Sequence, residues 1–164
     1  GLGSDIHKYE EGKKLILGGI EIPHTKGLEG HSDADVILHA LSDALLGAVS
    51  LGDLGEHFPA DSKNKNRAST EILHDVCLKV WGKGYYVVNA DIVVMAEEPK
   101  ISSHRDKMRT KIASILNVEM NKVGIKATTC EGLGAIGRHE GIYAQAIVLL
   151  HQRREVQKMS YKHE

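Results

Sequence analysis

Aromatic side chains are scarce in this sequence. The 164 residues include one Trp, one Phe and five Tyr, which together make up 4% of the chain. Proteins that stack nucleic-acid bases on aromatic rings need more of them. Basic and acidic residues nearly balance, with 21 Lys and Arg against 22 Asp and Glu. Without a basic excess or an aromatic platform, we expect no nucleic-acid partner.

Cysteine and long apolar runs are also lacking. The two cysteines, Cys77 and Cys130, make no disulfide framework and lack the spacing of a zinc ribbon. A reducing compartment is therefore expected. No apolar run is long enough to span a bilayer, so we expect no membrane partner. The glycines after Thr129 do not form a G-x-G-x-x-G before a helix, and no P-loop is present, which argues against those two nucleotide folds.

Hydrophobic periodicity predicts alternating strands and helices. Two β-branched runs around Gly18-Gly19 predict a hairpin, which is followed by a loop over residues 24–31. The other expected elements are helices in 31–55, 69–83 and 103–117 and strands in 1–8, 85–95, 123–129 and 142–150. Ser103, with Asp106 three residues later, is expected to cap the helix at 103–117.

The order of these elements predicts an α/β (α+β) fold. We expect a single domain over residues 1–150, with one mixed β-sheet of about four strands, helices packed on one face and a small β-hairpin. Residues 151–164 are predicted to be a polar C-terminal tail.

The stretch 31–55, HSDADVILHALSDALLGAVSLGDLG, carries the central helix and is expected to end in a glycine-bounded loop over residues 52–55. Ser32 with Asp35 three residues later predicts an N-cap with an acidic partner in the first turn. Asp35, His39 and Asp43 recur every four residues and so share one helical face. His39 has two interpretations: a core histidine with a satisfied hydrogen bond, or a metal ligand.

A D-x-H pair near the N-terminus favours the metal interpretation. In an extended segment, Asp5 and His7 project to the same face, although an exposed polar strand end would show the same pattern. With His39 they offer one carboxylate and two imidazoles. This set suits a tetrahedral Zn²⁺ with its fourth position open, and on ligand types alone Mn²⁺ or Co²⁺ competes.

The end of the strand at 123–129 offers a second polar cluster. The run from Lys126 to Glu131 combines hydroxyls, backbone N–H groups and a carboxylate. Hydroxyls and amides bind phosphate oxygens, and a carboxylate can hold a Mg²⁺ that bridges phosphates. An ordinary polar strand end is the alternative.

Several short motifs follow one another along the chain from Gly1 to about Leu150. They are S-D-I-H at 4–7, H-S-D-A-D-V-x-x-H at 31–39, D-A-L-L-G-A at 43–48, L-G-D-L-G at 51–55, P-K at 99–100 and K-A-T-T-x-E-x-L-G at 126–134. On these motifs the sequence resembles the 2-C-methyl-D-erythritol 2,4-cyclodiphosphate synthases of the non-mevalonate isoprenoid pathway.

The resemblance implies the cyclisation of 4-diphosphocytidyl-2-C-methyl-D-erythritol 2-phosphate with release of CMP. It implies that Asp5, His7 and His39 bind Zn²⁺ and that Glu131 holds a second divalent ion, Mg²⁺ or Mn²⁺. His31 and Thr129 would be catalytic. The implied substrate-binding residues are Ser32, Asp53, Gly55, Phe58, Asp61, Ser62, Ala96, Pro99, Lys100, Ile101, Ser102, Thr128 and Arg138.

The resemblance also implies a homotrimer with active sites shared between subunits. Family members can hold an isoprenoid diphosphate in a central cavity; Arg138 is kept here, but Ala135 and Gln145 replace the usual aromatic and glutamate. Ala60 stands where an aspartate is usual, in a loop that is one residue short. The implied location is cytoplasmic for a bacterial source and a plastid or plastid-like organelle for a eukaryotic one.

Two other functions compete with this interpretation. A metal-dependent phosphohydrolase on the same scaffold would use the same ligand set, and a non-enzymatic metal- or nucleotide-binding module would need no turnover. A cyclic diphosphate product separates the synthase from the hydrolase, and release of CMP separates an enzyme from a binding module.

Overall fold

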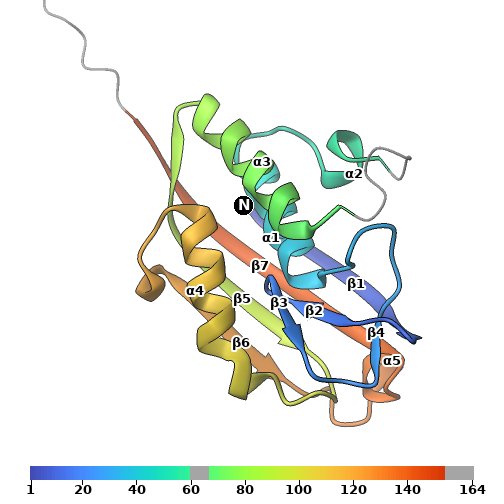
Figure 1. Cartoon of the computed structure of the whole chain (residues 1–164). Helices are drawn as coiled ribbons and strands as arrows, with labels where there is room; N and C mark the ends of the chain where they lie inside the picture. The colour runs from blue at the N-terminus through green and yellow to red at the C-terminus, as the bar shows by residue number, and fades with distance from the viewer. Residues whose placement is uncertain (60–66, 154–164) are drawn as a thin grey trace, which may run out of the picture.

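The structure is a computed structural model that describes residues 1–59 and 67–153 (Figure 1). The predicted Asp61 and Ser62 therefore lie outside the described residues, as does the tail from 154 onward. Within the described residues, no helix combines the length and the apolar character needed to cross a membrane.

A mixed five-stranded sheet in the order β4-β1-β7-β5-β6 forms the centre of the fold. Its strands are β1 (Leu2–Glu11), β4 (Lys26–Leu28), β5 (Tyr85–Met95), β6 (Val123–Thr128) and β7 (Gly141–Gln152). β5 and β6 are parallel, whereas β7 pairs antiparallel with both β1 and β5. The mixed sheet was predicted with about four strands. The additional one is β4, which pairs with the end of β1 inside the expected loop 24–31 and is too short to show periodicity.

Helices α1 (Val36–Ala48), α3 (Ser69–Gly82) and α4 (Arg105–Leu116) cover one face of this sheet, as predicted (Figure 1). The expected hairpin is present as β2 (Leu15–Leu17) and β3 (Ile20–Ile22). Four short helical segments complete the fold: α2 (Leu54–His57), η1 (Ile101–His104), η2 (Met120–Lys122) and α5 (Gly134–Gly137). The segment 52–55, expected to be a loop, thus enters a helix at Leu54.

The two faces of the sheet differ in burial. Alternate residues of β5 and β7, such as Ile92 and Ala146, point towards the helices and are fully buried. On the opposite face Leu2, Ile6, Ile147 and Leu149 are between 55% and 62% exposed. The uncovered face therefore carries an apolar patch in the middle of the sheet, where β1 and β7 pair.

Close packing joins α1 to β1. Gly3 lies on the helix side of β1, and a Cβ atom there would clash with the carbonyl oxygen of Ala40 in α1. Only glycine lets the strand and helix backbones approach this closely. This approach places His39, the residue before Ala40, next to the polar side chains of β1.

The N-cap of α1 is Asp35, and the prediction of Ser32 was wrong. Asp35 is fully buried, and its Oδ1 accepts the N–H groups of Ile37 and Leu38, both at 3.2 Å. The same carboxylate accepts the N–H groups of Gly18 at 3.0 Å and Gly19 at 2.7 Å. Burial raises the pKa of Asp35 to about 6, and the hydrogen bonds from the backbone oppose this shift. One carboxylate thus starts the helix and holds the turn of the β2–β3 hairpin.

The expected cap of the helix at 103–117 also differs. Ser103 lies within η1, and its hydroxyl donates to the carbonyl of Lys100 at 3.1 Å. α4 therefore begins at Arg105 and ends at Leu116, where Asn117 adopts a left-handed conformation. The 3₁₀ turn shifts the start of the helix because it uses the residues that sequence spacing assigned to the first α-helical turn.

Replacing Asp35 with alanine should destabilise the fold, because four buried or half-buried N–H groups lose their acceptor. We expect the free energy of unfolding to fall by about 2–4 kcal/mol, measured by urea denaturation. Glu119→Ala is the matched control, since this exposed acidic side chain caps nothing, and should change stability by less than about 0.5 kcal/mol. Equal stabilities for the two variants would contradict the role of Asp35.

Candidate functional site: a metal cluster and a nucleotide-sized cavity

Asp5 and His7 of β1 converge with His39 of α1. The Oδ2 atom of Asp5 lies 2.8 Å from Nε2 of His7 and 3.0 Å from Nδ1 of His39, and the two ring nitrogens are 3.2 Å apart. This is the one group of three or more potential metal-binding side chains found among the described residues. β1 brings Asp5 and His7 to the same face because they are two residues apart.

Contacts outside the cluster fix both imidazoles. His7 Nδ1 lies 2.6 Å from the carbonyl oxygen of Glu29, an atom that can only accept. His7 therefore donates from Nδ1 and directs the lone pair of Nε2 into the cluster. On His39, Nδ1 faces Asp5 while Nε2 faces the hydroxyls of Ser69 at 3.0 Å and Ser32 at 3.2 Å.

The electrostatics keep Asp5 ionised. Burial acts to raise the pKa of this carboxyl group, but its interactions with the side chains of His39 and His7 hold the pKa well below its ordinary value. A deprotonated carboxylate is the form that binds metal.

The three side chains fit a divalent metal. Tetrahedral Zn²⁺ with bonds of about 2.0–2.1 Å separates its ligands by roughly 3.3 Å, close to the 2.8–3.2 Å separations found here. The side chains of Asp5, His7 and His39 also keep 27%, 19% and 13% of their surface exposed. A ligand from solution can therefore reach the cluster, as a catalytic metal site requires.

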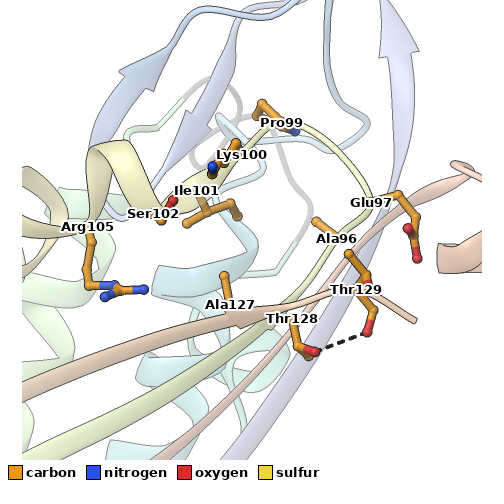
Figure 2. A pocket seen from close by; sticks show the side chains of 10 residues that line it. All are labelled: Ala96, Glu97, Pro99, Lys100, Ile101, Ser102, Arg105, Ala127, Thr128 and Thr129. Atoms are coloured by element: carbon orange, nitrogen blue, oxygen red, sulfur yellow. Dashed lines mark hydrogen bonds between the residues drawn. The ribbon is translucent and has the colours of Figure 1, made fainter. Parts of the chain in front are cut away.

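A cavity of about 360 Å³ lies between the end of β5, η1 and the end of β6 (Figure 2). This volume falls in the range of sites for small molecules. Ten residues line it: Ala96, Glu97, Pro99, Lys100, Ile101, Ser102, Arg105, Ala127, Thr128 and Thr129. All five residues predicted from the 96–102 segment are among them, together with Thr128 and Thr129.

Sequence reasoning missed Glu97, Arg105 and Ala127 in this cavity. The Oε1 atom of Glu97 accepts the N–H of Cys130 at 2.8 Å and so joins the two walls. Ala127 lies within the K-A-T-T motif, which could have indicated it. No sequence signal marks Arg105, because its place beside the cavity depends on how η1 leads into α4.

Glu131 follows this cavity along the chain. The hydroxyl of Thr129 donates to its Oε1 at 2.7 Å, while the hydroxyl of Thr128 donates to the carbonyl of Thr129 at 3.2 Å. Glu131 is exposed and lies in a left-handed backbone conformation. It does not belong to the cluster formed by Asp5, His7 and His39.

Asp53 lies in a different cavity. This one has a volume of about 350 Å³ and is lined by Asp53 and Asp43 together with the start of β1 and the glycines at 47 and 52. Asp53 caps α2, which contains Gly55, by accepting the N–H of Glu56 at 3.0 Å. Asp43 accepts the N–H of Leu54 at 2.7 Å, and burial raises its pKa.

The four remaining predicted residues among those described are His31, Ser32, Phe58 and Arg138. His31 lines an open cavity of about 420 Å³ with Glu10, Lys13, Glu29 and Gly30, and Ser32 contacts His39. The guanidinium carbon Cζ of Arg67 lies over the ring of Phe58, 5.4 Å from the centre of that ring. Arg138 is exposed and pairs with Glu140 at 2.7 Å.

Among the described residues, predicted site residues line three cavities and form the metal cluster. None of the three clustered side chains lines the cavity at 96–102, and Asp53 and His31 line separate cavities, among the residues that the structure describes.

A family model describes the whole folded region. The model of the YgbB family matches residues 1–151. This chain belongs to the YgbB family. The resemblance that its motifs indicated is confirmed.

Similar curated proteins carry one name. A 2-C-methyl-D-erythritol 2,4-cyclodiphosphate synthase from Alkaliphilus metalliredigens is 53% identical over 153 residues, which cover 93% of this chain and 96% of that protein. One from Chlorobium phaeobacteroides is 51% identical over 94% of this chain and 98% of that protein. Among solved structures, the Plasmodium falciparum IspF CDP complex has 37% identity and a TM-score of 0.83, covering 94% of this chain and 96% of that one.

A bifunctional relative shows the same fold as part of a longer chain. The bifunctional IspDF from Campylobacter jejuni has 43% identity and a TM-score of 0.90, and the match covers 93% of this chain but 42% of that one. The fold of the YgbB family thus also occurs within a longer chain.

Replacing His39 with alanine should abolish metal binding without unfolding the protein, because alanine is well tolerated in a helix. We expect the affinity for Zn²⁺ to fall by at least about a hundredfold, measured by competition with a chromogenic chelator. His74→Ala is the matched control, since His74 is a helical but exposed histidine outside the cluster, and should keep the wild-type affinity. Unchanged affinity in His39→Ala would show that the metal binds elsewhere.

Proposed function

We propose that this chain is a 2-C-methyl-D-erythritol 2,4-cyclodiphosphate synthase. It converts 4-diphosphocytidyl-2-C-methyl-D-erythritol 2-phosphate into the 2,4-cyclodiphosphate and CMP, as a phosphorus–oxygen lyase. The observation that carries the proposal is the match at 53% identity to 96% of the length of a synthase of this name. The clustered Asp5, His7 and His39 supply the metal site that such chemistry needs.

The cavity at 96–102 is proposed to bind the cytidine. Two of the similar solved structures are CDP complexes. Ala96, Pro99 and Ile101 offer backbone N–H and carbonyl groups, which can read the edge of a base without charged side chains. Lys100, Ser102 and Thr128 complete this pocket, and Asp53 with Gly55 is proposed to hold the ribose. Ser32, Phe58, Asp61 and Ser62 are proposed to contact the methylerythritol phosphate.

The reaction needs little acid–base chemistry. An oxygen of the 2-phosphate attacks the β-phosphorus, a new P–O bond forms, the bond from the β-phosphorus to the α-phosphate oxygen breaks, and CMP leaves with that electron pair. Both the attacking and the leaving phosphate are already ionised near neutral pH, so no strong base is required. The protein acts by positioning these groups and neutralising charge.

The cluster of Asp5, His7 and His39 is proposed to bind Zn²⁺, for which Mn²⁺ or Co²⁺ are competitors on ligand type. When bound, this ion supplies a Lewis acid that orients the β-phosphate. Glu131 is proposed to hold a second ion, Mg²⁺ or Mn²⁺.

His31 and Thr129 are proposed as the catalytic side chains. Thr129 lines the nucleotide cavity and can donate its hydroxyl to a phosphate oxygen in place of Glu131, its present acceptor. His31 is exposed and precedes α1, where an imidazole N–H can stabilise charge that develops on the diphosphate.

A homotrimer is proposed as the active assembly. No residue of the metal cluster lines the nucleotide cavity, which supports a site completed by neighbouring copies. The patch formed by Leu2, Ile6, Ile147 and Leu149 offers an apolar surface for this contact, and closed threefold symmetry would make all three sites equivalent.

The central cavity of this trimer is proposed to accept an isoprenoid diphosphate. Arg138 supplies an exposed cation for the diphosphate. Ala135 and Gln145 leave the cavity wider and less acidic than in relatives with an aromatic and a glutamate at these positions.

Incubation with the cytidine diphospho substrate and Zn²⁺ plus Mg²⁺ tests the proposed reaction. We expect CMP and the cyclic diphosphate in equal amounts, detected by mass spectrometry and ³¹P NMR. Inorganic phosphate or a linear hydrolysis product would instead identify the phosphohydrolase. Binding without any CMP release would identify a non-enzymatic module.

Mixed trimers test whether the sites are shared. His39→Ala removes the metal half, and Ala127→Trp fills the nucleotide cavity from an exposed position on β6. Each variant alone should be inactive, whereas co-refolded subunits should regain about a quarter of wild-type activity, because random assembly leaves about that share of interfaces intact. Ala127→Ser is the control and should stay active alone. Trimers that assemble but remain inactive would show that each site is built within one chain.

A further inference from the structure

Ser69 is a buried hydroxyl for which the proposed function has no role. It is the first residue of α3, is 1% exposed and lies 30 residues from His39. Its hydroxyl forms a short hydrogen bond to Oδ1 of Asp33, and its backbone N–H donates to Oδ2 of Asp33 at 3.0 Å. Asp33 thus binds both polar hydrogens of Ser69.

This pairing sets the direction of the hydrogen bond between Ser69 and His39. The hydroxyl of Ser69 donates to Oδ1 of Asp33, so its proton lies on the side of Asp33. The oxygen of Ser69 then faces Nε2 of His39, 3.0 Å away, with a lone pair. The bond between them forms only if His39 carries its proton on Nε2.

A contact at the other ring nitrogen of His39 favours the opposite tautomer. Oδ2 of Asp5 lies 3.0 Å from Nδ1 of His39 and would favour a proton there. A proton on Nδ1 occupies the lone pair that points into the metal cluster. Holding the proton on Nε2 leaves Nδ1 free, so the tautomer of His39 determines whether the cluster is ready to bind metal.

We propose that Ser69, held by Asp33, is a positioning residue that fixes the Nε2–H tautomer of His39 and so prepares the metal site. This proposal deepens the proposed function, since it rests on His39 as a metal ligand. Ser32 lies 3.2 Å from the same nitrogen and also accepts the N–H of Ala34, so Ser69, at 3.0 Å, is the nearer acceptor.

The hydrogen bonds from Asp33 through Ser69 to His39 also join three parts of the fold. Asp33 belongs to the segment between His31 and α1, and its carboxylate accepts the first N–H of α3, a helix whose N-cap Ala68 supplies no side-chain cap. Because Asp33 accepts both the hydroxyl and the backbone N–H of Ser69, the hydroxyl proton of Ser69 points away from His39. The metal ligand, the His31 segment and α3 are thereby held in one arrangement.

The tautomer can be measured in the metal-free protein by long-range ¹H–¹⁵N correlation NMR at about pH 8, where imidazoles are neutral. In the wild type we expect His39 as the Nε2–H form. Ser69→Ala should raise the Nδ1–H population and weaken Zn²⁺ binding by about 10–100-fold, measured by chelator competition. Ser69→Thr keeps the hydroxyl and should restore both properties.

Ser42→Ala is the matched control. Ser42 is also a buried serine, one turn after His39, but its hydroxyl donates to the carbonyl of Leu38 at 2.7 Å and does not touch the imidazole. This variant should lower the melting temperature without changing the tautomer or the affinity for Zn²⁺. A general loss of stability is thus separated from the specific effect of Ser69.

The outcomes are distinct. An Nδ1–H tautomer in the wild-type apo protein overturns the proposal without any variant, as does unchanged Zn²⁺ affinity in Ser69→Ala. Equal weakening in Ser69→Thr and Ser69→Ala, with the tautomer unmoved, overturns it as well. If the tautomer and affinity behave as expected but no cyclic product forms, the proposed function fails while the role of Ser69 stands.

Discussion

The close packing of α1 against β1 is the contact on which the functional site depends. Gly3 allows it, because any side chain there would meet the backbone of α1 at Ala40. The metal cluster therefore comes from two regular elements held backbone to backbone, which positions ligands more rigidly than loops do. Asp35 fixes the same helix at its start by binding the turn of the β2–β3 hairpin. Packing and capping act together to set where His39 points.

The polar contacts around this cluster prepare it for a metal. The carbonyl of Glu29 sets the tautomer of His7, the two histidines keep Asp5 ionised, and the hydroxyl of Ser69 faces the outer nitrogen of His39. Such outer contacts commonly orient metal-binding histidines. They matter especially for phosphoryl transfer between ionised phosphates, where catalysis comes from position and charge more than from proton transfer.

The division of the site between cavities bears on the proposed assembly. The cavity at 96–102 shares no lining residue with the metal cluster or with the cavity at Asp53. The same chain leaves an apolar sheet face uncovered, with Ile6 and Ile147 among its exposed side chains. The proposed trimer accounts for both features, since it would cover this face and bring the separate halves of the site together.

The sequence alone determined the features that depend on local spacing. The D-x-H pair had to share a strand face, Gly18-Gly19 had to turn a hairpin, and the long helices and strands followed from hydrophobic periodicity. Only the tertiary structure decided that Asp35 caps α1, that Lys26–Leu28 is a strand and that Ser69 reaches His39. Asp35 meets Gly18 across 17 positions and Ser69 meets Asp33 across 36, so each depends on chain folding that no local pattern encodes.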